Sequence, residues 1–354
     1  ALQHPDVGGL SGLLAHPNVQ GKLALFPDFS NINLAVSVFI IPVAVQWWSV
    51  WYPGSEPGGG GYIAQRMLAA KNERHALGAT FLFNVAHYAL RPWPWIIVAL
   101  CSLVVFPDLA SLQRAFPNVA AQVVKHDLGY PAMLTFLPAG LLGLVVASLV
   151  AAYMSTISTH LNWGSSYVVN DFYKRFVRPN ASEGELVLCG RIATFVLMAL
   201  ACYSSLFMQN AKQMFDIMIL VGAGTGLLFI LRWFWWRINA WSELAAMVIS
   251  FVVALAMQFV VKDTLQDWQK LVIGVGITTA GWVIVTLLTK PADEAVLRRF
   301  VALVRPGGPG WAAVIARSAA AGEPQPAGAA GSDMPRAILC MLLGCVAVYG
   351  VLCA

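Results

Sequence analysis

The sequence predicts an all-α protein, a bundle of helices that crosses a membrane several times. Two observations carry this prediction: 58% of the 354 residues are hydrophobic, and only 11% are charged. A soluble domain has about 25% charged residues, because it needs polar groups over most of its surface. The shortfall indicates that lipid covers much of this surface. The net charge of +5 is then expected to reflect Lys and Arg in cytoplasmic loops, not a nucleic-acid site.

Apolar runs long enough to span a bilayer, which takes about 20 residues, recur along the whole chain. Eight candidate spans lie at residues 33–52, 76–106, 131–161, 187–208, 214–236, 243–261, 270–289 and 336–354. In the second span, Pro92 and Pro94 predict a kink. The first seven spans form the predicted transmembrane core, residues 33–290, and residues 336–354 form a final, truncated span.

Basic residues favour every second loop between these spans, for example the loop with Lys174, Arg175 and Arg178. The positive-inside rule makes that side cytoplasmic, so the leading segment 1–32 is expected to be an external loop. Residues 291–335, which become rich in Gly, Ala and Pro, are expected to be a flexible cytoplasmic linker.

The two ends of the chain and its cysteines support further expectations. The chain starts with Ala and stops at VLCA, inside an apolar run, so we expect a piece of a longer protein. The six cysteines lie in or beside apolar runs without a CxxC pair. This pattern favours small buried hydrophobic residues over a metal or disulfide site.

Four hydroxyl side chains interrupt the third apolar run within the stretch VAAYMSTISTHLN, residues 150–162. Ala152, Ser155, Thr156 and Thr159 have the spacing of one helix face. Hydroxyl and carbonyl oxygens are hard ligands that suit a small hard cation, and the small Ala leaves room beside them. The alternative is that the hydroxyls bond back to carbonyls one turn earlier, or hold neighbouring helices together.

Three stretches of the chain share the motifs of one transporter family. The first is PAGLLGLVVASLVAAYMSTISTHLNWGSSYVVNDFYKRFVRP (138–179), with a Pro-x-Gly-x-x-Gly opening, a Ser-Thr pair and an Asp-x-Tyr-Lys ending. The second is GYIAQRMLAAK (61–71), with a Gln-Arg-x-x-x-Ala-Lys signature, and the third, weaker one is FWWR (234–237). In order and spacing, residues 33–290 resemble the sodium:solute symporter family, which includes the sodium-coupled sugar and proline transporters.

This resemblance implies a leucine-transporter-type fold, in which two inverted five-helix repeats surround a site at mid-membrane. The chain would contain core helices six to ten and three further helices. The resemblance also implies a sodium ion between the first and eighth core helices. Its eighth-helix ligands would be the carbonyl of Ala152 and the hydroxyls of Ser155 and Thr156. The other ligands would come from the N-terminal half of the same protein, which is therefore expected to be needed for activity.

The aromatic segment VAVQWWSVWYPGSEPGGGG, residues 43–61, is the candidate substrate side. It places Gln46, Trp47, Trp48 and Trp51 on the inner half of the first span, before a helix break at the Pro-Gly pair. Residues four apart share a helix face, and aromatic walls stack on sugars or hold an ammonium group. The alternative is an aromatic belt at the membrane surface.

A second polar stripe in the second span consists of Asn84, His87 and Arg91. Ionisable groups inside a span are costly and usually functional. His87 falls where sugar symporters of the family carry a lysine, and Arg91 would clamp a carboxylate or extend to the membrane surface. The stripe predicts a substrate or gating role. The solute stays open among sugars, amino acids, carboxylates and quaternary amines.

Together, these patterns predict sodium-coupled import of a small organic solute by a multi-pass protein of the cell membrane, of the bacterial inner-membrane kind. The expected partners are the solute, Na⁺ and the lipid bilayer. The alternative is a symporter-like sensory module of a signalling protein, which needs a downstream kinase. An enzyme that acts through His87, His160 or Asp216 is disfavoured, because the sequence has no HExxH, GxSxG or paired His-Asp motif.

Overall fold

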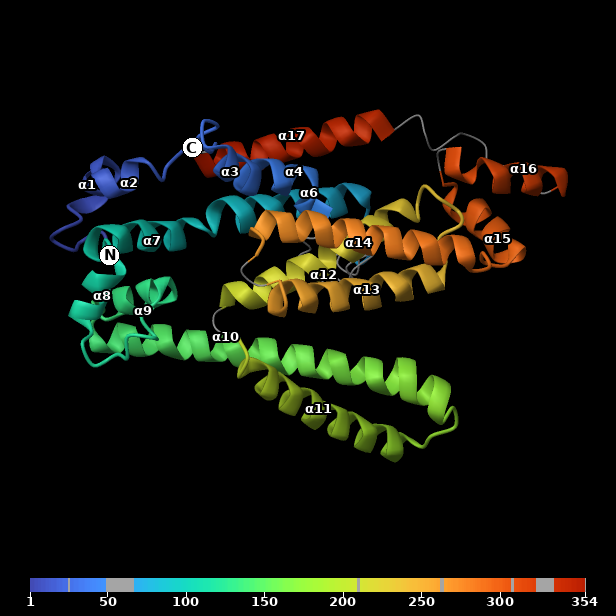
Figure 1. Cartoon of the computed structure of the whole chain (residues 1–354), viewed down its shortest axis with the longest axis horizontal. Coiled ribbons are helices and arrows are strands. Elements are labelled where there is room, and N and C mark those ends of the chain that lie inside the picture. Colours follow the sequence, from blue (N-terminus) through green and yellow to red (C-terminus); the bar gives the residue numbers. More distant parts are fainter. Residues whose placement is uncertain are drawn as a thin grey trace. The chain divides into compact units, whose positions relative to one another are not determined.

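The computed structural model describes residues 1–24, 26–48, 67–208, 211–261, 264–306, 309–322 and 334–353 (Figure 1). Every regular element in these residues is helical, and seven helices are long and apolar enough to cross a membrane. They are Glu73–Val105, Ala139–Val177, Glu183–Ser205, Met214–Leu231, Ala240–Phe259, Asp267–Leu288 and Pro335–Leu352. The predicted all-α, multi-pass class is therefore confirmed.

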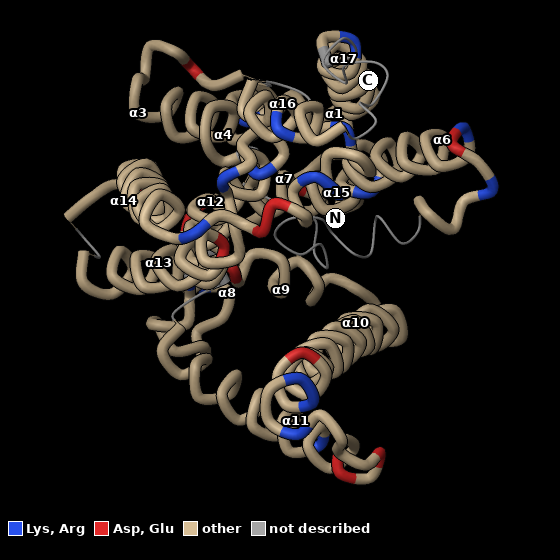
Figure 2. The backbone as a smooth tube through the Cα atoms, turned by 90° about the vertical axis from the view of Figure 1, so that its right-hand side faces the viewer, with Lys and Arg blue, Asp and Glu red and all other residues tan. Residues whose placement is uncertain are grey.

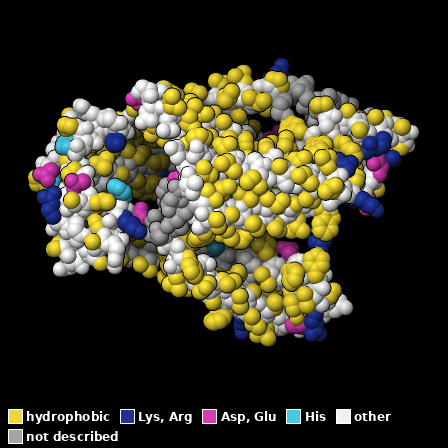
Figure 3. All heavy atoms as spheres, viewed as in Figure 1, with side chains coloured by type: hydrophobic (Ala, Val, Ile, Leu, Met, Phe, Trp, Pro, Cys, Tyr) yellow, Lys and Arg dark blue, Asp and Glu magenta, His cyan; other side chains and the backbone are white. Residues whose placement is uncertain are grey.

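The surfaces of these helices have the composition that lipid requires. Large apolar side chains such as Leu144, Phe195 and Leu288 are exposed along the spans. Figure 3 shows hydrophobic side chains over the visible helix faces, and Figure 2 shows charged residues mainly near helix ends and turns. A soluble protein rarely exposes such large contiguous apolar surface. These faces therefore fit a lipid environment.

The chain forms two compact units, each of which is built from two segments of the sequence. Unit 1 consists of residues Ala1–Leu23 and Trp95–Met214. Unit 2 consists of residues Ala24–Pro94 and Phe215–Ala354. Residues 33–290, expected to form one transmembrane core, are divided between the two units.

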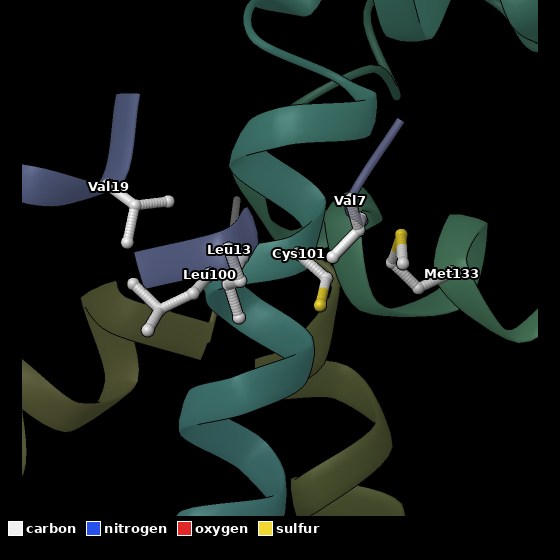
Figure 4. Packing of buried hydrophobic residues seen from close by; sticks show 6 residues of the cluster. All are labelled: Val7, Leu13, Val19, Leu100, Cys101 and Met133. Carbon is white, nitrogen blue, oxygen red and sulfur yellow. The ribbon is translucent and has the colours of Figure 1, made fainter. Parts of the chain in front are cut away.

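The leading segment of unit 1 is more structured than the predicted external loop 1–32. It contains α1 (Gly9–Ala15) and α2 (Pro17–Gln20), which pack on α7 (Trp93–Val105). The buried residues of this cluster are Val7, Leu13, Val19, Leu100, Cys101 and Met133 (Figure 4). Its short helices escape a periodicity search because they are only seven and four residues long.

Three short helices follow α7 in unit 1. They are α8 (Leu109–Ala115), the 3₁₀ turn η4 (His126–Leu128) and α9 (Gly129–Leu134). Asp108 caps α8, because its carboxylate accepts a hydrogen bond of 2.6 Å from the backbone N–H of Ser111. Burial of Leu112, Val124 and Ala132 in one cluster holds α8 and α9 together. These elements connect α7 to the long helix that follows.

The longest helix of unit 1 begins later and ends later than the predicted span 131–161. α10 runs from Ala139 to Ser166 and continues as the π-helical segment η5 (Tyr167–Val177). It begins after Pro138, because proline lacks the N–H that an earlier helical turn would need. α11 (Glu183–Ser205) runs beside it after a short turn.

The first predicted span of unit 2, residues 33–52, is interrupted earlier than its sequence indicates. α3 (Ile32–Ala35), the π turn η1 (Val36–Ile40) and α4 (Ile41–Ala44) form one apolar helix that ends before Val45. The 3₁₀ turn η2 (Gln46–Trp48) follows. The expected break at Pro53-Gly54 and the whole GYIAQR stretch lie outside the described residues.

The second predicted span has the expected irregularity. α6 (Glu73–Asn84) passes into the π turn η3 (Val85–Leu90), and α7 begins at Trp93 after a turn at Arg91 and Pro92. Pro92 and Pro94 have no backbone N–H to donate, which explains why the helical hydrogen bonding stops there. The C-terminal helix α17 (Met334–Cys353) contacts η3.

Three further spans complete the core of unit 2: α12 (Ala211–Leu231), α13 (Ala240–Phe259) and α14 (Asp267–Leu288). α13 and α14 pack along each other through small and hydroxyl residues, among them Ala246, Ser250 and Thr278. Small residues let membrane helices approach closely, and buried hydroxyls bond across them. The Thr286 hydroxyl donates to Ser242 Oγ at 2.6 Å.

Within residues 291–335, which are expected to be a flexible linker, the described part contains helical elements. They are α15 (Glu294–Val304), the 3₁₀ turn η6 (Pro309–Trp311) and α16 (Ala312–Ala320). Leu297, Val301, Trp311 and Val314 are buried together against Trp236. The Gly, Ala and Pro content suggested a linker, but α15 and α16 each bury one apolar face on their neighbours.

Candidate functional site

The candidate sodium ligands lie on an exposed face of α10 in unit 1. Ala152, Ser155, Thr156 and Thr159 are all exposed among the described residues. The Thr156 hydroxyl donates to the carbonyl oxygen of Ala152 at 2.9 Å, and the Thr159 hydroxyl donates to that of Ser155 at 2.8 Å. Two of the four side chains therefore bond back to the preceding turn, which was the alternative to ion binding.

This bonding pattern is compatible with a cation ligand but does not require one. A hydroxyl has one proton to donate and keeps lone pairs that can accept. The oxygens of Ala152 and Thr156 are 2.9 Å apart, so they lie side by side on the helix surface. If the hydroxyl rotates its proton away from Ala152, both oxygens can point lone pairs at one ion. Sodium would then replace the hydrogen bond between Thr156 and Ala152, and the hydroxyl would keep its proton.

The polar stripe of the second span forms a local pair in unit 2. The guanidinium of Arg91 lies 2.7 Å from Nδ1 of His87, through its Nη1 atom. Arginine has no acceptor, so Nδ1 accepts this hydrogen bond and the imidazole carries its proton on Nε2. The ring of His87 also stacks on Phe83, with centroids 5.1 Å apart. His87 lies in the π turn and Arg91 directly follows it, so the pair joins two residues four positions apart.

Asn84 does not join this pair directly. Its side-chain amide donates to the carbonyl oxygen of Thr80 at 2.8 Å, one turn earlier on α6. The prediction that Asn84, His87 and Arg91 share one stripe assumed a regular α-helix. The structure instead changes to π geometry at Val85. His87 and Arg91, four residues apart, contact each other, and Asn84 bonds to its own helix.

The aromatic segment meets the middle of α12. The indole Nε1 of Trp48 donates to the carbonyl oxygen of Ala223 at 3.1 Å. A Cβ atom on Gly226 would overlap the carbonyl oxygen of Trp48 and lie 3.1 Å from its Cδ1. The end of η2 therefore rests on the small-residue surface of α12, and the glycine is required for this close approach.

The other candidates on the aromatic segment lie only partly within the described residues. Gln46 is half-buried in η2, and the backbone of Trp47 lies in the same turn. Trp51 lies outside the described residues. The α-helix ends at Ala44, before the aromatic residues, and the expected pairing of Trp47 with Trp51 lies outside the described residues.

Ala223 and Gly226 are the functional candidates that the search for polar and aromatic residues missed. The sequence signal for them is the run Gly-Ala-Gly-Thr-Gly at 222–226. Its small residues indicate that another segment packs closely here, but they do not indicate which segment. Thr225 in the same run is buried, and its hydroxyl donates to the Val221 carbonyl oxygen at 3.1 Å.

The residues considered for enzyme chemistry are not assembled into a centre. His160 Nδ1 lies 2.8 Å from the carbonyl oxygen of Thr156 on its own helix. Within the described ranges, no group of three or more His, Cys, Asp and Glu side chains could hold a metal ion. A sodium site of carbonyl and hydroxyl oxygens uses none of these residue types.

The sequence was compared with known proteins, and residues 23–250 match the model of the sodium:solute symporter family. The chain is 33% identical to the sodium/proline symporter of Haemophilus influenzae over 84% of this chain and 57% of that protein. It is 30% identical to the mouse sodium/myo-inositol cotransporter 2, over 58% of this chain and 31% of that protein. It is 28% identical to the sodium/glucose cotransporter of Vibrio parahaemolyticus, over 56% and 38%.

These comparisons agree with the resemblance seen in the motifs. The chain spans between 31% and 57% of the length of the three relatives. Each relative is named as a transporter, which confirms the expectation that the chain is not an enzyme. The three names cover an amino acid, a cyclitol and a sugar, so they leave the solute open.

Proposed function

Because the chain belongs to the sodium:solute symporter family, we propose that the intact protein imports a small organic solute together with sodium. The single observation that carries the site assignment is the oxygen-bearing face of α10. There the carbonyl of Ala152 and the hydroxyls of Ser155 and Thr156 lie exposed on one side of a membrane span. An exposed polar stripe on an apolar helix is costly in lipid, which supports a role for it inside the intact protein.

Sodium binds, in this proposal, between this face and a second helix of the full-length protein. The second helix supplies the remaining oxygen ligands and shields the stripe from lipid. The N-terminal half is then necessary for coupling. Basic residues gather in alternate loops, which supports a cytoplasmic location for the loops that follow α10 and α12.

One coupled ion is enough to drive accumulation. Moving a single charge through roughly 100 mV releases about 2.3 kcal/mol. A tenfold sodium gradient adds about 1.4 kcal/mol. The sum corresponds to several hundredfold accumulation of an uncharged solute, by the rule that each 1.4 kcal/mol is a factor of ten.

The solute is proposed to bind near the interrupted helix of unit 2. The indole N–H of Trp48 is already bonded to Ala223, so Trp48 holds the interrupted helix against α12. Only its ring surface is then available to contact a solute. Gln46 contributes a polar group from the same turn, and Trp47 and Trp51 are aromatic candidates on the basis of the sequence alone. His87 and Arg91 act as a hydrogen-bonded unit at the second span, where the guanidinium is the group that would meet a carboxylate. We leave the solute class at an organic molecule of sugar, amino-acid, carboxylate or betaine type.

The test of this proposal measures sodium binding to the full-length protein by thermal unfolding. Sodium at ten times its dissociation constant is expected to stabilise the protein by about 1.4 kcal/mol, and potassium is not. Ser155→Ala and Thr156→Val each remove one hydroxyl, so each should raise the required sodium concentration about tenfold. Valine keeps the branched shape of threonine.

The control is Ser158→Ala, which removes a hydroxyl from the same helix outside the stripe. It should leave the sodium response unchanged. If Thr156→Val and Ser158→Ala respond to sodium equally, the ligand assignment is wrong. The same assay, repeated with sugars, amino acids, carboxylates and betaines with and without sodium, identifies the solute class.

A further inference from the structure

A cavity in unit 2 lies where two membrane-spanning helices end. α12 ends at Leu231 and α13 begins at Ala240, and residues 232–239 form the α12–α13 turn. α15 packs beside this turn, and between them is a cavity of about 480 Å³, which we call the turn groove. Its volume falls within the range of small-molecule sites, roughly 300–1,000 Å³.

The walls of the turn groove are held from behind by specific contacts. The indole Nε1 of Trp311 donates to the carbonyl oxygen of Trp233 at 2.9 Å. The guanidinium of Arg317 lies 5.1 Å from the ring centre of Trp236 and donates to the Glu294 carboxylate at 2.9 Å. These contacts fix both sides of the groove, so it is a built recess and not a gap between loose segments.

The lining combines apolar walls with one pair of opposite charges. Trp233, Trp236 and Phe300 supply aromatic surface. The only acidic and basic side chains in the lining are Arg232 and Glu243, joined by a hydrogen bond of 3.0 Å. They are 33% and 37% exposed, so both can meet a ligand at the mouth of the groove. A matching ligand carries an anionic group and a cationic group close together, attached to an apolar remainder.

The position of the turn groove in the membrane selects one class of ligand with this chemistry. Arg232 directly follows a span and Glu243 lies in the first turn of the next one, which puts the charged pair at the depth of lipid headgroups. Val296 and Leu303 on α15 are largely exposed and continue the apolar surface away from the groove. A zwitterionic phospholipid has a phosphate, an ammonium group and acyl chains in this order.

We propose that the turn groove binds a phospholipid with a phosphoethanolamine headgroup. The phosphate accepts hydrogen bonds from Arg232, and the primary ammonium donates to the carboxylate of Glu243. The glycerol and upper acyl chains lie along Phe300 and Val296. A choline head has no N–H for Glu243, and a purely anionic head brings a like charge to it. The groove therefore prefers ethanolamine over both.

The experiment measures which lipids stay bound to the full-length protein in mild detergent, by native mass spectrometry. The protein is offered equal amounts of phosphatidylethanolamine, phosphatidylcholine and phosphatidylglycerol. We expect the first to be retained about tenfold over phosphatidylglycerol. Glu243→Gln keeps the size of the side chain and an acceptor for Arg232, and it should remove this preference. Phe300→Ala opens the wall without touching the charges, and it should lower retention of ethanolamine and choline lipids together.

The control is Glu185→Gln, which alters another Arg–Glu pair near the end of a span, 3.2 Å from Arg178, and should change nothing. Equal retention of the three lipids, or a preference for phosphatidylglycerol, overturns the proposal. So does an unchanged ethanolamine preference in Glu243→Gln. Free phosphoethanolamine should not displace the bound lipid at equal concentration, and if it does, the ligand is a soluble zwitterion instead.

Discussion

Replacing Gly226 with alanine tests the contact between the interrupted helix and α12. The added Cβ would overlap the carbonyl oxygen of Trp48 and press on its ring at 3.1 Å. Overpacking of this kind costs about 1–3 kcal/mol. The upper end applies because the overlapping atom is a backbone carbonyl oxygen, which cannot move away as a flexible side chain can. Alanine also favours a helix over glycine by about 1 kcal/mol. We expect Gly226→Ala to lower the free energy of unfolding by about 2 kcal/mol.

The matched control is Gly276→Ala on α14, where a Cβ would meet nothing within 4 Å. Only the gain in helix propensity remains there, so the free energy of unfolding should rise by about 1 kcal/mol. The two variants carry the same chemical change in neighbouring spans and should differ by about 3 kcal/mol. Equilibrium unfolding of the purified protein in detergent micelles, followed by circular dichroism, measures this difference.

Equal stability of the two variants would refute the close approach of Trp48 to α12. A Trp48→Phe variant gives an independent reading, because phenylalanine keeps the aromatic surface and loses the N–H that binds Ala223. Trp48→Phe should lower the free energy of unfolding by about 1 kcal/mol. This effect should vanish in the Gly226→Ala background, where the turn is already displaced.

Two predictions concern residues 294–320. The hydrogen bond from Arg317 holds the pKa of the Glu294 carboxyl below its ordinary value, so the folded state resists protonation of this group. The contribution of Glu294 to stability is present above about pH 4.3 and is lost as the pH falls through the lowered pKa of the folded state. The difference in thermal midpoint between the native protein and Glu294→Gln should shrink over that window. Trp311→Phe removes the indole hydrogen bond, so amide exchange in α15 and α16 should rise about fivefold at neutral pH. Trp268→Phe, whose indole donates to the Gln266 side chain at the start of α14, should leave that exchange unchanged.

Local pattern was enough for much of the candidate sodium site. The three candidate ligands Ala152, Ser155 and Thr156 are spaced for one face of a helix, and α10 runs through all of them. The back-bonding of Thr156 to Ala152 was also foreseen as an alternative, because it involves only residues four apart. What surrounds this face cannot be found by periodicity, since a helix face carries no information about which distant segment covers it.

The substrate candidates and the linker show where local pattern failed. Apolar residues continue past Ala44, so hydropathy gave no sign that the helix stops at Val45. Residues 306–320 have the composition of a linker, yet Trp311 anchors them to Trp233. In both places the backbone follows contacts with another segment and departs from its own propensity.

The sequence by itself determined the membrane class, the positions of most spans and the hydroxyl stripe of α10, because hydrophobic length and helical spacing are properties of neighbouring residues. Only the tertiary structure decided that Trp48 binds α12 and that α15 folds back on the α12–α13 turn. The Trp48–Ala223 bond joins residues 175 positions apart. Such a pair forms only when the close approach allowed by a glycine and the burial of apolar surface act together, and neither is visible along one stretch of chain.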